Sequence, residues 1–197
     1  MRRAVTALVA VVLAAAAVAG AAAGQDERAP RLEVHRFPSP SMVPRFEIGD
    51  RLEFDLDAYA GDAEPARGDI VLYHAPKGSL SLDHQCGRPR HPGRRLCRLP
   101  RGGPVEERFV KRVVAVAGDR IRARRDGRFV VDGRRERRRI VRCSGDECRF
   151  RGRIRVPEGH VYVAGDNRPG SDDSRYWGAL PVGDVLGRYT RTLPAEG

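Results

Sequence analysis

Turn signals divide most of this chain into segments too short for long helices. Gly-Asp pairs stand at residues 49–50, 68–69, 118–119 and 165–166, and Asp-Gly pairs at 126–127 and 132–133. Short runs such as Leu32–Phe37 and Arg51–Leu56 alternate apolar and polar residues, which is the period of a β-strand with one buried face. No segment after the N-terminal region repeats its apolar residues with a helical period over three turns. The pattern therefore predicts a mainly β fold.

The N-terminal region is different in kind. Arg2 and Arg3 are followed by residues 4–24, which carry no charge and could cross a bilayer as one helix. A cleaved signal peptide is the competing interpretation, because three small residues at 21–23 would suit a cleavage site. We favour a retained transmembrane helix. The arginines would keep residues 1–3 in the cytoplasm and place the chain from Gln25 onward on the outer side of the membrane.

The net charge of +11 is concentrated in one segment. Arg120–Arg155 holds 15 arginines and five acidic residues, a local excess of ten positive charges. This segment has no helix-turn-helix pattern, zinc-finger spacing or aromatic RNA-recognition signature, so we expect no nucleic-acid partner. A basic lobe that faces anionic lipid headgroups explains the charge at least as well as nucleic-acid binding does.

Four cysteines lie in segments that read as loops. Cys86 and Cys97 belong to residues 74–107, a stretch rich in Pro, Gly and Arg, and Cys143 and Cys148 are separated by four residues. Four cysteines allow three pairings, and on an exported chain we predict the two local disulfides, Cys86–Cys97 and Cys143–Cys148. A zinc site drawn from the cysteines and histidines at 84–97 fits no standard spacing, so no metal site is predicted.

Two serines stand one residue apart in Phe37–Asp50. Ser39 and Ser41 are flanked by prolines at 38, 40 and 44, which restrict their own φ and push the preceding residue towards an extended conformation. We expect a stiff, non-helical strand or loop that displays the serines. Such a serine is either a nucleophile or a loop residue that satisfies backbone groups.

The lysines are more informative than their number suggests. Lys77 and Lys111 are the two lysines beside 35 arginines. Arginine stays protonated, whereas a buried lysine can lose its proton and act as a general base. Lys111 lies near the start of an apolar run at 108–121, where the alternative is an ordinary solvated charge at a strand edge.

A turn-rich loop follows the apolar run His160–Ala164. It begins with Gly165-Asp166 and carries Ser171, Asp173 and Arg175. Taken by itself, this loop is either part of a functional site or a hydrogen-bonded turn with a structural Asp173–Arg175 ion pair.

Four of these segments together resemble the conserved boxes of bacterial type I signal peptidases, which are membrane-anchored Ser-Lys serine proteases. They read, in order, PSPSMVP with its following GD, RGDIV, KRVVAVAGD and GDNRPGSDDSRYWGALP. The resemblance implies an antiparallel β catalytic domain, here residues 25–119 and 156–197. It also implies a smaller inserted β lobe, here residues 120–155.

The resemblance also implies a role for each matching residue. Ser41 corresponds to the nucleophile, Lys111 to the general base, and Ser39 to a hydroxyl that joins the Ser41 backbone N–H in the oxyanion hole. Ser171 corresponds to a serine that orients the lysine, and the pair at 173 and 175 to a supporting ion pair. The chain departs from the family where Pro40 replaces a common glycine, which bears most on Ser39. No metal or organic cofactor is implied.

The expected function is removal of signal peptides from exported preproteins with small residues at positions −1 and −3. The enzyme would sit in the inner (plasma) membrane by a single span, with membrane lipid as its other partner. Two alternatives remain open. One is a specialised conjugation or pilus maturation protease of the same superfamily, and the other is a non-catalytic basic β module that binds anionic lipid or nucleic acid.

Overall fold

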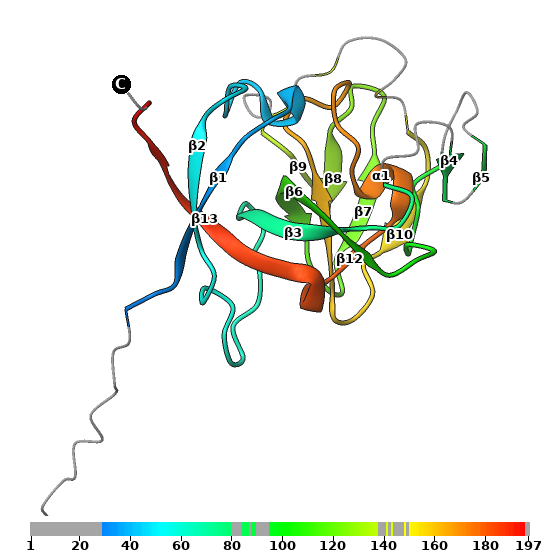
Figure 1. Cartoon of the computed structure of the whole chain (residues 1–197). Coiled ribbons are helices and arrows are strands. Elements are labelled where there is room, and N and C mark those ends of the chain that lie inside the picture. The colour runs from blue at the N-terminus through cyan, green and yellow to red at the C-terminus, as the bar shows by residue number, and fades with distance from the viewer. Residues whose placement is uncertain are drawn as a thin grey trace, which may run out of the picture.

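The computed structural model describes residues 29–79, 84–86, 88–89, 95–137, 141, 143, 148 and 150–195. Two sheets and a short hairpin make up the fold (Figure 1), and the prediction of a mainly β protein is confirmed. The segment 4–24, predicted to span the membrane, lies outside these residues. Within them, no helix has the length and apolar character needed to cross a membrane.

The larger sheet has seven strands in the order β1-β2-β13-β3-β6-β11-β12. Neighbouring strands are antiparallel throughout. The strands are β1 (Leu32–Arg36), β2 (Arg51–Asp55), β3 (Ile70–Pro76), β6 (Pro104–Ala115), β11 (His160–Ala164), β12 (Leu180–Pro181) and β13 (Val185–Leu193). The strands of this sheet therefore come from both sides of the arginine-rich segment.

The arginine-rich segment forms a second antiparallel sheet. Its four strands lie in the order β10 (Arg153–Arg155), β7 (Arg120–Ala123), β8 (Phe129–Val131) and β9 (Arg134–Arg135). Its apolar face is not a separate core, because Ile121 and Phe129 belong to the same buried cluster as Val113, Tyr162 and Trp177 of the main domain. The two sheets therefore share one core.

Among the described residues, three short helical turns can be delimited. They are η1 (Pro40–Met42), α1 (Ser174–Trp177) and η4 (Val182–Asp184). The long loop expected at 74–107 is wrong in extent, because β3 continues to Pro76 and β6 already begins at Pro104. A hairpin of β4 (His84–Gln85) and β5 (Arg88–Pro89) lies between them. The first part of β6 was not predicted because its residues 104–108 are mostly polar and exposed.

A second buried cluster supports the chain around η1. Met42, Phe46 and Phe37 pack with Leu72 of β3 and Val110 of β6. The loop is also closed by backbone bonds, since the Phe37 N–H donates to Asp50 O and the Gly49 N–H donates to Phe37 O, both at 2.8 Å. The serine segment is thus fixed to the middle of the larger sheet.

The turn after α1 offers a test of this packing. Gly178 has φ +113°, and a Cβ there would lie 2.6 Å from Leu99 Cα, whereas a Cβ at Gly183 would meet nothing within 4 Å. We expect Gly178→Ala to lower the free energy of unfolding by about 2 kcal/mol or more, because it adds both backbone strain and a clash with main-chain atoms. Urea denaturation would measure it, with Gly183→Ala as the matched control. Equal stability of the two variants would contradict the described packing.

Candidate functional site

Ser41 lies in the single turn of η1 and is 3% exposed. The non-helical conformation expected for both serines is wrong for Ser41, because the φ of Pro40 also suits the first residue of a helical turn. Ser39 remains extended, with φ −134° and ψ 157°, and caps the turn. The Ser41 N–H donates to Ser39 Oγ at 3.5 Å, and the two hydroxyl oxygens are 3.0 Å apart.

The loop after β11 holds this turn from the other side. The Asn167 N–H donates to Ser41 O at 3.0 Å, and Asn167 Nδ2 donates to Pro40 O at 3.0 Å. Gly165 lies so close that a Cβ there would be 2.4 Å from Ser41 O. A glycine is therefore required by close approach of two backbones. Sequence reasoning assigned neither residue a role.

Lys111 lies within β6, with its side chain 4% exposed. Its Nζ is 3.0 Å from Ser41 Oγ and 3.0 Å from Val110 O. The interpretation as a solvated edge charge is therefore wrong. Burial lowers the pKa of Lys111 to about 8, although the negative charges of Asp173 and Asp172 oppose the shift. An appreciable fraction of the amine is then neutral near neutral pH.

A buried ion pair lies beneath the catalytic candidates. Asp173 is 0% exposed, and Arg175 donates to both of its carboxylate oxygens, from Nε at 2.7 Å and from Nη2 at 2.8 Å. Burial by itself would raise the pKa of Asp173, but the charge and hydrogen bonds of Arg175 outweigh it and hold the pKa below its usual value. Ser171 Oγ donates to the same carboxylate at 2.7 Å. The loop between β11 and α1, residues 165–173, is therefore organised around one ionised carboxylate, and we call it the site loop.

Arg168 connects this loop to the inserted sheet. Its guanidinium is buried and donates to Gly165 O, Gly127 O and Glu136. Gly127 and Glu136 belong to the arginine-rich segment, so the second sheet supports the site loop directly. Sequence reasoning missed this link because the partners are separated by more than 30 residues.

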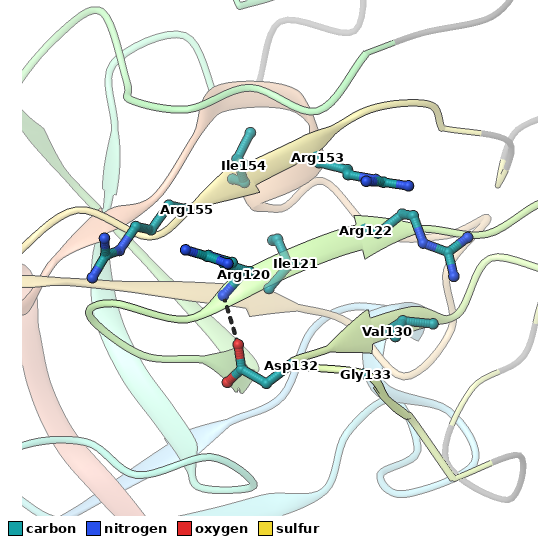
Figure 2. Close-up of a pocket in the computed structure, with 9 residues that line it drawn as sticks. All are labelled: Arg120, Ile121, Arg122, Val130, Asp132, Gly133, Arg153, Ile154 and Arg155. Atoms are coloured by element: carbon teal, nitrogen blue, oxygen red, sulfur yellow. Dashed lines mark hydrogen bonds between the residues drawn. The ribbon is translucent and has the colours of Figure 1, made fainter.

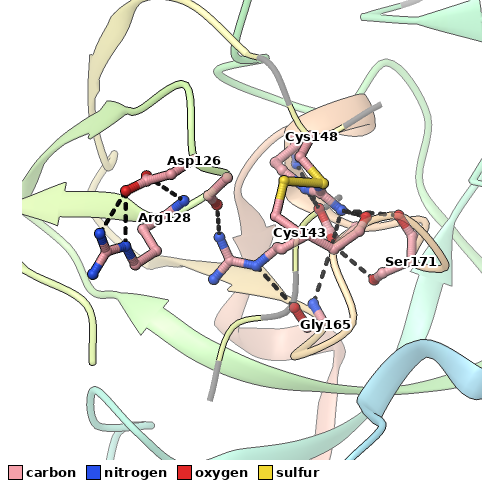
Figure 3. The surroundings of a disulfide bond; sticks show 10 residues. Asp126, Arg128, Cys143, Cys148, Gly165 and Ser171 are labelled. Atoms are coloured by element: carbon pink, nitrogen blue, oxygen red, sulfur yellow. Dashed lines mark hydrogen bonds and ion pairs between the residues drawn. A yellow bond between two sulfur atoms is a disulfide. The ribbon is translucent and has the colours of Figure 1, made fainter. Parts of the chain in front are cut away.

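Both predicted disulfides are present, Cys86–Cys97 and Cys143–Cys148. Figure 3 shows the second beside Gly165 and Ser171. Its sulfur and Cβ atoms also pack against Gly127, the residue whose carbonyl accepts from Arg168. The disulfide therefore packs against Gly127, which holds the site loop through its hydrogen bond with Arg168.

The candidate residues open onto a cleft of about 510 Å³. One wall comes from β1 and the segment after it, including His35, and the other from β6 near Arg108. β1 is the last strand on its side of the sheet. On the other side, β11 covers only residues 112–115 of β6, so the earlier part of β6 has no strand on this edge. Within the described part of the chain, both strands therefore have a free edge facing the cleft. Arg108 Nη1 and Glu33 Oε1 meet at 2.6 Å across it.

Comparison with known proteins identifies the family. The family model described as "Signal peptidase, peptidase S26" matches residues 2–193. The chain belongs to this family. It is 30% identical to a probable signal peptidase I-1 from Synechocystis sp. over 83% of this chain and 72% of that protein.

Other members of the family are comparably similar. Identity is 30% with a signal peptidase I from Leptolyngbya laminosa, over 79% of this chain and 66% of that protein. It is 31% with a probable thylakoidal processing peptidase 2 of Arabidopsis thaliana, over 79% of this chain but 36% of that protein. The chain thus spans less than two thirds of the length of these two relatives.

The structure brings together most of the residues singled out from the sequence. Ser39, Ser41, Lys111 and Ser171 line the same cleft, and the buried pair of Asp173 and Arg175 lies behind it. The hydrogen bond of the Ser171 hydroxyl goes to Asp173, so an influence on the lysine would pass through the carboxylate. Across the described residues, no group of three or more His, Cys, Asp or Glu side chains is arranged to hold a metal ion.

The pKa of Lys111 makes stability depend on pH. It is about 8 in the folded protein, and the ordinary value is 10.5. Between these values the unfolded chain binds a proton that the folded protein does not, so stability rises with pH. We expect the free energy of unfolding of the wild type to rise relative to Lys111→Met by up to about 1.4 kcal/mol per pH unit over this range.

Urea denaturation between about pH 7 and pH 10 would measure this difference. Lys77→Met is the matched control, because it removes the charge of a lysine that is exposed. A Lys111→Met curve parallel to that of the wild type would contradict the buried, readily deprotonated amine.

Proposed function

We propose that this chain is a type I signal peptidase that removes signal peptides from exported preproteins at the outer face of the membrane. Ser41 would be the nucleophile and Lys111 the general base. The observation that carries the proposal is the 3.0 Å contact between Lys111 Nζ and Ser41 Oγ, made by a lysine whose pKa is lowered to about 8. A serine hydroxyl needs an adjacent base, and a lysine can serve only when it is neutral.

The chemistry proceeds through an acyl-enzyme. Neutral Lys111 takes the Ser41 proton as Oγ attacks the carbonyl carbon of the scissile peptide bond. The protonated lysine then gives this proton to the leaving amine as the C–N bond breaks. Water, deprotonated by the same lysine, hydrolyses the ester and frees Ser41.

The negative charge on the tetrahedral oxygen requires hydrogen-bond donors. The Ser41 N–H and the Ser39 hydroxyl lie at the same end of the η1 turn and would supply them. In the structure these two groups face each other, so substrate binding would replace their mutual contact by contacts with the oxyanion. Asn167 fixes the carbonyls of this turn and is a positioning residue in this scheme.

The substrate would bind as an added strand. A peptide lying between β1 and β6 could hydrogen-bond to both free edges, which fixes it in an extended conformation. A preference for small residues at −1 and −3 is part of this proposal and rests on the family. The apolar residues 4–24 would hold the enzyme on the membrane where preproteins are tethered.

Cleavage of a preprotein with an Ala-x-Ala site by the detergent-solubilised chain tests the proposal. We expect Ser41→Ala and Lys111→Met to lower kcat/KM by at least about 10³-fold, because each removes one half of the nucleophile–base pair. Lys77→Met should retain full activity, since that lysine is exposed and does not line the cleft. Mass spectrometry of the new N-terminus would locate the cut.

Activity should also rise with pH towards a plateau above about pH 8, as Lys111 loses its proton. A folded wild type that leaves the preprotein uncut would refute general signal-peptide cleavage. The specialised maturation protease would then be tested with its own type of substrate.

The ion pair across the cleft tests the binding mode. Arg108→Glu places a second carboxylate opposite Glu33, and the repulsion should widen the rim of the cleft. We expect KM to rise several-fold with little change in kcat, because the pair forms no hydrogen bond with Ser41 or Lys111 and is partly exposed. The charge swap Glu33→Arg/Arg108→Glu should restore KM. A swap as poor as the single variant, or a loss confined to kcat, would argue against a peptide in this gap.

A further inference from the structure

The outer face of the four-stranded sheet carries arginines in opposed pairs. The register of β7 and β10 places Arg122 opposite Arg153 and Arg120 opposite Arg155. Ile121 lies between the two β7 arginines and points to the shared core, so the arginines project from the other face. Figure 2 shows the four guanidinium groups around a shallow hollow of about 690 Å³. We call these four residues the arginine face.

The arginine face has almost no negative charge of its own. Asp132 is the acidic residue that lines the hollow, and it is already engaged by the Arg120 N–H and the Arg67 guanidinium. Arg155 donates to a backbone carbonyl, that of Gly118. Within the described chain, none of the four guanidinium groups forms an ion pair. Their charge is therefore not neutralised by the fold.

A bound anion would relieve the repulsion within the arginine face. Like charges directly opposite on neighbouring strands repel, and nothing in the packing of Ile121 and Ile154 requires arginine on the other face. Guanidinium groups form paired hydrogen bonds with phosphate oxygens, and four of them around one hollow suit several phosphates at once. The face is thus built for phosphodiester anions.

The shape and position of the face favour lipid over nucleic acid. The hollow is lined by Arg, Ile, Val, Asp and Gly and offers no aromatic ring on which a base could stack. The uncharged residues end at Gly24, and β1 begins at Leu32. The eight Cα-to-Cα steps from Gly24 to Leu32 span at most roughly 28 Å, so an anchored chain keeps the domain close to the bilayer.

One loop joins the start of β1 to the arginine face. Arg31 pairs with Asp57 where the β2–β3 loop begins, and Arg67 near the end of that loop contacts Asp119 and Asp132. The β2–β3 loop, residues 56–69, therefore contacts both the start of β1 and the edge of the hollow.

We propose that the arginine face binds the phosphodiester headgroups of anionic phospholipids and docks the domain on the bilayer. The inference rests on the membrane location in the proposed function. Docking would hold the folded domain at a fixed orientation on the membrane instead of leaving it to swing on its linker.

Hydrogen exchange of the full chain in lipid nanodiscs tests the inference. β10 is an edge strand, so part of its backbone exchanges readily in the free protein. We expect exchange in β7 and β10 to slow several-fold when phosphatidylglycerol is added to phosphatidylcholine. The effect should disappear as salt is raised from about 0.05 to 0.5 M, because the contact is electrostatic.

Two variants with the same change in net charge separate a site from a general charge effect. The first replaces the four residues of the arginine face by Gln. The second replaces four exposed arginines elsewhere by Gln, namely Arg98, Arg101, Arg125 and Arg188. Protection should be lost in the first and kept in the second. Equal loss in both, or no lipid-dependent protection in the wild type, would overturn the proposal.

A parallel arm replaces the anionic lipid by a DNA duplex added to phosphatidylcholine discs. Protection of β7 and β10 by DNA but not by phosphatidylglycerol would refute lipid docking in favour of nucleic-acid binding. Preprotein cleavage is measured in the same discs, so the two proposals fail separately. Lipid protection without cleavage would refute the protease function alone, and cleavage without lipid protection would refute the docking alone.

Discussion

The removal of water from the Lys111 amine is the constraint that most of the surrounding structure serves. A protonated lysine is stable in water, so the strands and the site loop must enclose it before it can stay neutral. Asp173 works against this, because a carboxylate close by favours the charged amine. Arg175 reverses part of that effect and also satisfies the carboxylate. The ion pair therefore lets a buried acid organise the loop without protonating the lysine.

The second sheet takes part in this enclosure. Arg168 spans from the site loop to Gly127 and Glu136, and Phe129 packs against Tyr162 with ring centroids 5.8 Å apart. The arginine-rich sheet is thus continuous with the larger sheet in its packing. Changes in the arginine-rich segment can reach the site through buried contacts, while its outer face stays available for a different task.

The sequence predicted which residues meet in the cleft better than how they are held there. The Ser41 and Lys111 pair followed from the resemblance of four short segments and from the scarcity of lysine, and the alternating runs were enough for a mainly β fold. The contacts of Asn167 and Arg168 could not be predicted, because they join segments distant in the chain and depend on strand order. The η1 turn was missed because prolines suit both an extended loop and the start of a helical turn. The start of β6 was missed because residues 104–108 are mostly polar and exposed, so they lack the apolar alternation that marks a strand.

The open edges of β1 and β6 have a consequence beyond catalysis. Unpaired strand edges attract any extended chain, including those of other copies, and are a common origin of aggregation. The exposed start of β6 is charged, with Glu106, Glu107 and Arg108, and Glu33 faces it from β1. Charges of this kind hinder the stacking of identical edges. The same charged side chains would therefore both hinder self-association at this gap and border the path of a bound peptide.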